Sequence, residues 1–331
     1  MSTARELVFA DAGKPEVKVD FMRTVSRHLT HKRRIENVYL TSLSQRGEAD
    51  FVIGAYVPQA NLFLNEMKSH PGDVTLTIAE IGRQAGMAVC HEYLGVGHAN
   101  AFILNSSGLE LLPALHAVDW SDDDTLVINV SVKETAHDED GALRSIGATE
   151  EFYANGVLVC RQFNDWAIQP VERYRRLREL SRAKSRRGGQ AMPEKIGGLK
   201  IQSNPQAKRS VLAENYWVAQ GGASFVGILE VDQSNLFFFD HANDHVPGML
   251  ILEGMREMAV DLASRFGWPE GRSPRIQTIE LSFKSFAELD SPVSLVAQLS
   301  GIPENGEPLS IHLEVRQAGK VLGDGSFIIA A

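Results

Sequence analysis

Residue types suited to catalysis gather in one segment of the chain, FFFDHANDHVPGMLILEGMRE at residues 237–257. Two Asp-His pairs, Asp240-His241 and Asp244-His245, crowd into a short turn ahead of an apolar stretch. A histidine that is oriented by a carboxylate can remove a proton from a hydroxyl group, which is the task of a general base. We therefore expect His241 or His245 to act as a base and Asp240 or Asp244 to orient it.

Pro247 and Gly248 come directly after this turn and indicate the start of a helix. Proline suits the first helical turn, and glycine lets another group approach the backbone closely. The first backbone N–H groups of a helix have no partner within it and attract negative charge. The N–H groups after Gly248, beginning with Met249, are therefore candidates for binding a substrate oxyanion.

An acidic and a basic residue recur three positions apart within two apolar helical stretches, as Glu253 with Arg256 and as Glu80 with Arg83, next to Gln84. Residues three apart share one face of a helix. If that face is buried, each isolated charge costs several kcal/mol, so the two need each other or a ligand. The alternative is a surface ion pair, which stabilises little.

The histidines also have interpretations other than a catalytic base. A zinc site at His241 and His245 is an alternative, but the Pro-Gly after them and the lack of a glutamate between the two argue against it, so we expect no metal and no cofactor. His70, in SHPGD, is either a turn residue or a catalytic partner. His31, in HKRR, is most simply solvent-facing. We interpret five more as structural: His91, His98, His116, His137 and His312.

An internal repeat organises the chain. Residues 49–66 and 223–240 are identical at eight of eighteen positions, and the match continues, with one residue deleted, from 77–89 to 250–262. That continuation pairs Glu80 with Glu253 and Arg83 with Arg256. The sequence therefore predicts a duplicated domain with copies of about 140 residues.

Each copy has the same order of expected elements. An alternating stretch (50–57, 224–231) predicts a strand, a turn-rich segment comes after it, and a mostly apolar helix comes next at about 76–94 and 249–266. Gly95 and Gly267 lie just past these helices, where left-handed caps are expected. Strand-like runs complete the copies at 101–105, 125–132, 148–154 and 158–163, and at 276–283, 293–300, 309–317 and 325–330. The pattern predicts an α+β fold in which an antiparallel sheet wraps one long helix.

We divide the chain into an N-terminal segment (1–24), a first copy (25–170), a basic linker (171–195) and a second copy (196–331). Between residues 172 and 187 the linker holds eight Arg or Lys and two Glu, and Gly188-Gly189 comes next. This composition predicts a basic helix that ends in a flexible connector. The helix is either a solvated connector or a docking patch for an acidic partner.

Composition restricts the class of protein. The 331 residues are 44% apolar and 23% charged, which is typical of a globular protein, and the net charge of −9 argues against nucleic acid as the main partner. No apolar run approaches the length of a membrane-spanning helix, and the N-terminus does not resemble a signal peptide. Cys90 and Cys160 lie in apolar runs, so we expect buried, reduced thiols and a cytoplasmic location.

These motifs resemble two related families. HVPGMLILE, leading into a buried helix, is similar to the hotdog fold of β-hydroxyacyl-acyl-carrier-protein dehydratases, in which Glu253 matches the catalytic glutamate. The closer resemblance is to the AfsA-type A-factor biosynthesis family, which carries two hotdog copies. It rests on His70-Pro71 … Glu80-x-x-Arg83-Gln84 and on Phe239-Asp240-His241 … Asp244-His245-Val246-Pro247-Gly248-Met249 … Glu253-x-x-Arg256. Glu257 stands where this family usually repeats the Gln of position 84.

The resemblance implies an α+β tandem double hotdog, an intrachain pseudo-dimer whose further association stays open. It also implies an acyltransferase that joins a β-ketoacyl group from acyl carrier protein to dihydroxyacetone phosphate, giving a butenolide phosphate precursor of a γ-butyrolactone-type signalling molecule. In hotdog pairs the sites lie between copies, so Glu80 is a candidate partner for the histidines of copy two, and His70 for Glu253. Arg83 or Arg256, with Gln84, would bind the phosphate or hold the neighbouring glutamate. The alternatives are a dehydratase or thioesterase acting on carrier thioesters, and a non-catalytic binder of acyl lactones.

Overall fold

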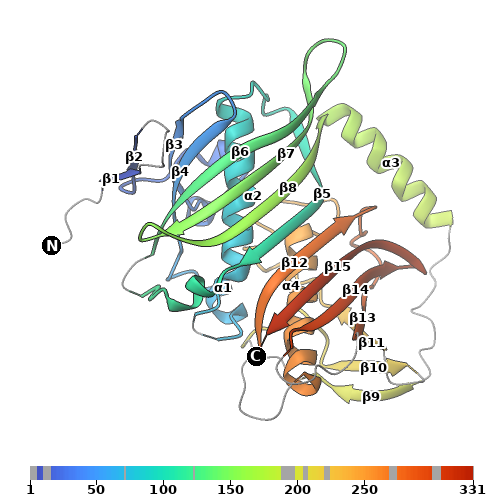
Figure 1. Cartoon of the computed structure of the whole chain (residues 1–331). Coiled ribbons are helices and arrows are strands. Elements are labelled where there is room, and N and C mark those ends of the chain that lie inside the picture. Colours follow the sequence, from blue (N-terminus) through green and yellow to red (C-terminus); the bar gives the residue numbers. More distant parts are fainter. Residues whose placement is uncertain are drawn as a thin grey trace. The chain divides into compact units, whose positions relative to one another are not determined.

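A computed structural model describes residues 6–9, 16–70, 72–121, 124–187, 198–203, 208–219, 224–267, 274–299 and 307–330 (Figure 1). The chain forms two compact units. The first contains residues Met1–Asn65 and Gly72–Val171, and the second contains Glu66–Pro71 and Glu172–Ala331. The short segment 66–71 precedes the long helix of the first copy in the sequence, yet it belongs to the second unit.

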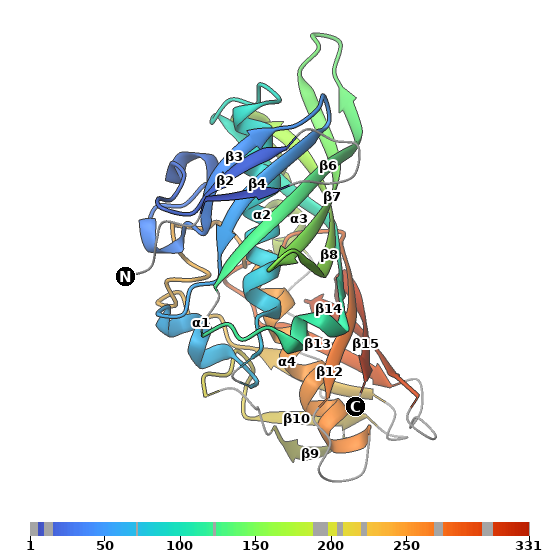
Figure 2. The same ribbon diagram turned by 60° about the vertical axis from the view of Figure 1, so that its left-hand side comes forward.

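Unit 1 is built on six antiparallel strands in the order β3-β4-β6-β7-β8-β5. Their bounds are β3 Leu40–Gln45, β4 Asp50–Tyr56, β5 Asn100–Leu111, β6 Thr125–His137, β7 Leu143–Ala154 and β8 Val157–Pro170. A separate hairpin of β1 (Glu6–Phe9) and β2 (Val17–Asp20) precedes them, and the 3₁₀ turns η1 (Arg27–Thr30), η2 (Ile35–Asn37) and η3 (Pro113–Ala117) connect elements. Figure 2 shows the strands curving around the long helix α2.

Helix α2 (Thr75–Glu92) is buried over most of its circumference because the sheet of unit 1 wraps it. Two glycines allow this close packing. A Cβ at Gly82 would lie 2.2 Å from the Gln162 side chain, and a Cβ at Gly86 would lie 2.2 Å from the ring of Trp166, which is itself buried. The expected apolar helix and its enclosing sheet are therefore both present in the first copy.

Unit 2 repeats this arrangement with seven strands in the order β12-β15-β14-β13-β11-β10-β9. Their bounds are β9 Gly198–Gln202, β10 Asn215–Ala219, β11 Ser224–Leu229, β12 Arg275–Phe283, β13 Val293–Leu299, β14 Leu309–Gln317 and β15 Lys320–Ala330. Helix α4 (Gly248–Phe266) packs against this sheet, and helix α3 (Val171–Arg187) precedes β9. The short helix α1 (Leu62–Met67) spans the boundary between the two units in the sequence.

The repeat found in the sequence is also present in local hydrogen bonding. In copy one the Asn65 N–H donates to the Asn61 carbonyl at 3.0 Å, and in copy two the Phe239 N–H donates to the Asn235 carbonyl at 2.9 Å. Asn61 and Asn235 are paired by the offset of the repeat, so equivalent residues fold equivalent turns. The duplication is therefore structural as well as sequential.

The two expected glycine caps differ. Gly95, just after α2, has the left-handed φ of 68° that the sequence predicts. Gly267 does not, because its φ is −81° and its N–H donates to the Ala263 carbonyl at 2.8 Å, continuing the helical pattern. The prediction of a left-handed cap at Gly267 is therefore wrong.

Cys90 and Cys160 are buried free thiols, as expected. Within the described part of the chain, none of the helices is long and apolar enough to cross a membrane.

Gly86 provides a test of the packing of helix and sheet. Alanine is intrinsically the better helix former by about 1 kcal/mol, but the added methyl group would collide with the buried Trp166 ring. We expect Gly86→Ala to lower the free energy of unfolding by about 1–3 kcal/mol, as overpacking does. Chemical denaturation measures this. Gly248→Ala is the matched control, because its Cβ meets only Phe283 at an ordinary 3.6 Å. A Gly86→Ala protein as stable as the parent would contradict the packing described.

Candidate active site

Asp244 and His245 form an oriented pair in the loop that leads into α4. With its proton on Nδ1, His245 donates to Asp244 Oδ1 at 2.7 Å, and the side chain of His245 is 27% exposed. This tautomer leaves Nε2 with a lone pair, which is the state that a general base requires. Of the sequence-predicted residues in this turn, these two therefore have the geometry of a base and its orienting carboxylate.

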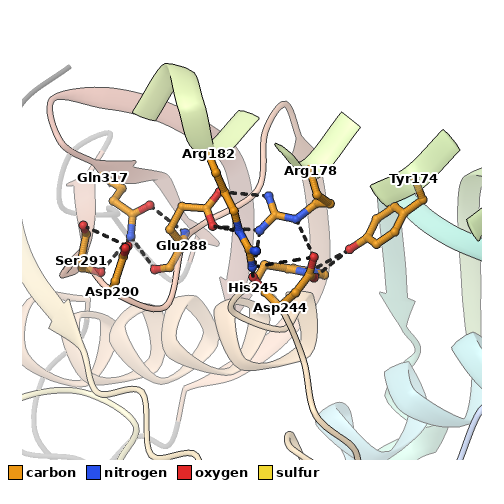
Figure 3. Close-up of polar contacts among 9 residues, drawn as sticks. All are labelled: Tyr174, Arg178, Arg182, Asp244, His245, Glu288, Asp290, Ser291 and Gln317. Atoms are coloured by element: carbon orange, nitrogen blue, oxygen red, sulfur yellow. Dashed lines mark hydrogen bonds and ion pairs between the residues drawn. The ribbon is translucent and has the colours of Figure 1, made fainter. Parts of the chain in front are cut away.

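Helix α3 holds this pair from the other side (Figure 3). The Tyr174 hydroxyl donates to Asp244 Oδ1 at 2.8 Å, and Arg178 Nε donates to Asp244 Oδ2 at 3.0 Å. Arg178 and Arg182 both donate to the Asp244 carbonyl oxygen, at 2.8 and 2.6 Å. Burial alone would raise the pKa of Asp244, but the bonds from His245, Tyr174 and Arg178 outweigh it and hold that pKa well below its usual range. Asp244 is therefore ionised and can fix the imidazole of His245.

Arg178 is anchored beyond Asp244 by a buried ion pair. Its Nη1 and Nη2 donate to the two carboxylate oxygens of Glu288 at 2.9 and 2.8 Å, and its guanidinium lies 4.5 Å from the centre of the Phe286 ring. The Glu288 backbone is tied in turn to Gln317 through two bonds of 2.8 Å. Phe286 also contacts the His245 ring edge-on, with centroids 4.9 Å apart. One face of α3 is thus part of the wall around His245.

This contact corrects one of the two interpretations of the basic helix, that of a fully solvated connector. The helix forms as expected, and its Arg178 side chain is only 2% exposed, so this face of the helix is not solvated. The docking of an acidic partner on the exposed residues of the helix stays a prediction. Arg175, which pairs with Glu172, does face solvent. The connector expected after Gly188 lies outside the described residues.

The other Asp-His pair has a different geometry. Asp240 is buried, whereas the His241 side chain is 52% exposed, and its Nδ1 lies 3.9 Å from Asp240 Oδ2, beyond hydrogen-bonding distance. His241 therefore lacks the alignment seen at His245. The phenylalanines at 237–239 are buried, as core residues are.

Glu253 and Arg256 form a fully buried pair on α4, not a surface pair. Arg256 Nε and Nη2 each donate to one Glu253 carboxylate oxygen at 2.7 Å. Arg256 also reaches the segment 66–70, donating to the Met67 carbonyl at 3.0 Å and to Ser69 Oγ at 3.2 Å. The half-buried His70 comes directly after Ser69, so the structure brings the His70 segment to the Glu253–Arg256 pair.

Gly248 and Met249 begin α4, with Pro247 at the N-cap. The first amides bonded within the turn are those of Leu250 and Ile251, which donate to the Pro247 carbonyl at 3.0 and 3.2 Å. The N–H groups of Gly248 and Met249 therefore precede the first intrahelical bonds, as the sequence predicts.

In unit 1, Glu80 is the centre of an equivalent buried cluster. Arg83 donates to both of its oxygens at 2.8 Å, and Gln84 Nε2 donates to Oε1 at 2.9 Å. Lys32 Nζ lies 2.9 Å from the same oxygen, a partner that the sequence does not reveal because a basic run such as HKRR is typical of a solvated segment. Burial raises the pKa of Glu80, but Arg83 and Lys32 together hold it far below its usual range.

Gln84 and Glu257 occupy equivalent positions and make equivalent backbone contacts. Gln84 Oε1 accepts from the Tyr39 N–H at 3.0 Å, and Glu257 Oε2 accepts from the Val211 N–H at 2.9 Å. Gln84 also donates to the Asn37 carbonyl, whereas Glu257 accepts from the Ser210 hydroxyl. Burial, together with the nearby Glu253, raises the pKa of Glu257 to about 7 despite these bonds.

A second buried polar cluster in unit 1 was not found from sequence. The Asn164 amide donates to Glu150 Oε2 at 3.0 Å, and its oxygen accepts from the Ser107 hydroxyl at 2.8 Å. Burial raises the pKa of Glu150 well above its ordinary value, because the charged carboxylate is poorly solvated there. Gly82 on α2 lies against this cluster, because a Cβ there would meet Glu150 and Gln162. The sequence does not indicate this cluster, because its strand residues alternate in the same way as any other inward-facing residues of the sheet.

The histidines His31, His91 and His98 also differ from expectation. The sequence favours one solvent-facing residue and two separate structural ones, but the structure brings all three together in unit 1, with one ring nitrogen from each within 4.8 Å of those of the other two. They come from three segments, so no spacing rule connects them.

The chain is similar to known proteins along most of its length. The sequence pattern of the A-factor biosynthesis hotdog domain matches residues 14–162 and 208–331. Two relatives are described as 2-oxo-3-(phosphooxy)propyl 3-oxoalkanoate synthases. That of Streptomyces virginiae is 24% identical over 290 residues, covering 86% of this chain and 90% of the relative. That of Streptomyces coelicolor is 27% identical over 290 residues, covering 84% and 83%.

A solved structure described as an oleoyl thioesterase from Lactobacillus plantarum superposes with a TM-score of 0.51 at 10% identity, covering 86% of this chain and 96% of that one. At this identity the likeness concerns the fold alone. Together with the match to the hotdog domain, it confirms the tandem hotdog fold expected from sequence.

The raised pKa of Glu257 predicts a pH-dependent stability. Between about pH 4.5, its ordinary pKa, and pH 7, the folded protein keeps a proton that the unfolded chain has released. The free energy of unfolding therefore falls as pH rises through this range. Glu257→Gln removes the titrating carboxyl group. As pH rises from about 4.5 to 7.5, the free energy of unfolding of the variant should therefore increase by up to about 3 kcal/mol relative to that of the parent. Denaturant titrations across this range measure the difference.

Gln84→Glu is the reciprocal control for this prediction. It would place a carboxylate against the Asn37 carbonyl and remove the amide that donates to Glu80, so we expect it to destabilise at neutral pH. Parallel pH profiles of the parent and Glu257→Gln would contradict the assignment of the titrating group.

The docking of α3 predicts unequal effects along the basic helix. Arg178→Ala leaves the buried Glu288 without its bidentate partner, so we expect a loss of about 2–4 kcal/mol in the free energy of unfolding. Arg175→Ala removes only an exposed pair with Glu172 and should change stability by less than about 0.5 kcal/mol. Thermal and chemical unfolding of the two variants distinguish them, and equal effects would refute a docked helix.

Proposed function

Since the chain belongs to the A-factor biosynthesis hotdog family, we propose that it is an acyltransferase that joins a 3-oxoacyl group to dihydroxyacetone phosphate. The acyl group would arrive as a thioester on acyl carrier protein. The observation that carries this proposal is the Asp244–His245 pair, an imidazole oriented by an ionised carboxylate directly ahead of the helix bearing the buried Glu253.

The name of the two relatives describes the product of such a transfer. A 2-oxo-3-(phosphooxy)propyl 3-oxoalkanoate is an ester between a 3-oxo acid and one hydroxyl of dihydroxyacetone phosphate. In the proposed step the hydroxyl oxygen attacks the thioester carbonyl, the new C–O bond forms, the C–S bond breaks, and the hydroxyl proton passes to the leaving thiolate by way of the base. No oxidant or reductant is needed. A subsequent aldol-type condensation with loss of water would close the ester to a butenolide phosphate.

His245 is the proposed base. Its Nδ1 is engaged with Asp244, so its Nε2 can accept the hydroxyl proton. Tyr174 and Arg178 are positioning residues in this proposal, because they bind Asp244 and not a reacting group. The N–H groups of Gly248 and Met249 would stabilise the oxyanion that develops on the carbonyl.

The arginines divide into two roles. Arg83 and Arg256 each bind both oxygens of the glutamate three residues before them. This supports the second of the two roles expected for them, holding a buried carboxylate. Arg182 is the guanidinium we propose for the phosphate, because its side chain is 44% exposed and lies 3.9 Å from Asp244 Oδ2.

The alternatives differ in the substrate they require or in the product they form. A thioesterase would release free 3-oxo acid whether or not the phosphate is present, a dehydratase requires a 3-hydroxyacyl thioester, and a binding protein would show no turnover. The roles of Glu80 and His70 as catalytic partners stay part of the proposal.

We expect the purified chain, incubated with 3-oxoacyl carrier protein, to release carrier thiol only when dihydroxyacetone phosphate is present, and to form the phosphorylated ester detectable by mass spectrometry. His245→Ala should lower kcat by about 10²–10⁴, the usual contribution of a general base. Glu253→Gln should also lose activity, while Arg175→Ala should retain it. Free acid produced without the phosphate would exclude the acyltransferase, and full activity of His245→Ala would exclude the proposed base.

A further inference from the structure

Three histidines from separate segments of unit 1 converge at the C-terminal end of α2. His31 caps the turn η1, His91 lies in the last turn of α2, and His98 lies in the loop before β5. One ring nitrogen from each lies within 4.8 Å of those of the other two, and the imidazole centroid of His91 lies 4.8 Å from that of His31 and 4.5 Å from that of His98. We propose that this cluster binds one divalent transition-metal ion of the zinc class.

The state of His91 suits a metal ligand. Its Nδ1 donates to the Val96 carbonyl at 2.6 Å, so the lone pair resides on Nε2. This is the outer-shell bond that commonly orients a ligating imidazole. His91 Nε2 lies 2.7 Å from His31 Nε2, so His31 Nε2–H donates to the lone pair of His91, and a metal ion would take the place of this shared proton. Two imidazole nitrogens on a tetrahedral zinc ion lie about 3.3 Å apart, since each Zn–N bond is about 2.0–2.1 Å, so a small outward movement of the rings suffices.

The surroundings favour a bound cation. The negative end of the α2 dipole lies here, because His91 is in the last turn. The nearby charge of Lys32 is offset by Glu80 at 2.9 Å. Phe102 packs edge-on against His31 and His91 and shields one side.

The ligand type indicates which ions fit. A set made of imidazoles suits zinc, copper, nickel and cobalt, and it is unsuited to magnesium or calcium, which prefer oxygen. Solvent or His28 would complete the coordination, since the His28 ring lies 6.1 Å from that of His98. An ion here would join η1 to the end of α2. It would thereby hold Lys32, the next residue after His31, on the buried Glu80.

The test uses the full chain without a histidine tag, stripped with chelator and then equilibrated with Zn²⁺. We expect about one zinc per chain by mass spectrometry, visible absorption bands when Co²⁺ replaces zinc, and a rise in Tm on adding Zn²⁺. His31→Ala, His91→Ala and His98→Ala should each weaken binding by at least about 10-fold and abolish the rise in Tm. His98→Ala is the decisive variant, because His98 is exposed and its removal spares the core.

Three further variants complete the design. His137→Ala, at the exposed end of β6, should bind zinc as the parent does, and His28→Ala reports whether His28 or solvent is the fourth ligand. His245→Ala should retain zinc, so the metal site is distinguished from the proposed catalytic pair. The proposal is overturned if the parent retains no stoichiometric zinc, or if His98→Ala and His91→Ala retain it unchanged.

Discussion

The structure depends on a buried carboxylate in the second turn of each long helix. Glu80 and Glu253 are both inaccessible to solvent, and an ionised carboxylate there is tolerable only with cations and hydrogen-bond donors in direct contact. Each helix supplies its own guanidinium three residues later, on the same face, in a bidentate pair. Since the pair is local, it can form with the helix, and the sheet then encloses a charge that is already neutralised.

The two copies complete this pair with different partners, which changes the charge of each cluster. In unit 1 the carboxylate of Glu80 has two cations, Arg83 and Lys32, and a neutral amide, Gln84. In unit 2 Glu253 is paired with Arg256 and shares its surroundings with a second acid, Glu257. Burial and the second carboxylate together disfavour a further negative charge, so Glu257 keeps its proton to near-neutral pH. The change from amide to acid at this position thus adds a group that titrates near neutral pH to the cluster of copy two.

Local periodicity accounts for the features that could be predicted from the sequence. Strand alternation, the apolar helices and the buried Glu-Arg pairs all depend on residues a few positions apart, and they agree with the structure. The repeat was recognised because the same local patterns occur twice in the chain. The partners that were missed are far away in sequence, as Lys32 is from Glu80 and Glu288 is from Arg178, because only the path of the chain brings them together. One face of the basic helix carries a residue every four positions, at Tyr174, Arg178 and Arg182. This spacing was overlooked because the many basic residues of the segment predicted a solvated helix. Gly267 fails as a cap because the helical pattern continues through it.

The segment between the copies makes the two halves of the duplicated chain unequal. The turn ahead of α2 has one histidine, His70, whereas the turn ahead of α4 has the Asp244–His245 pair. That pair is oriented by α3, a helix that lies between the repeats and precedes only the second of them in the chain. A pair of identical subunits would present two equal turns. Joining the copies through a helix that binds Asp244 therefore orients the turn ahead of α4 by a contact that has its origin in the segment between the copies.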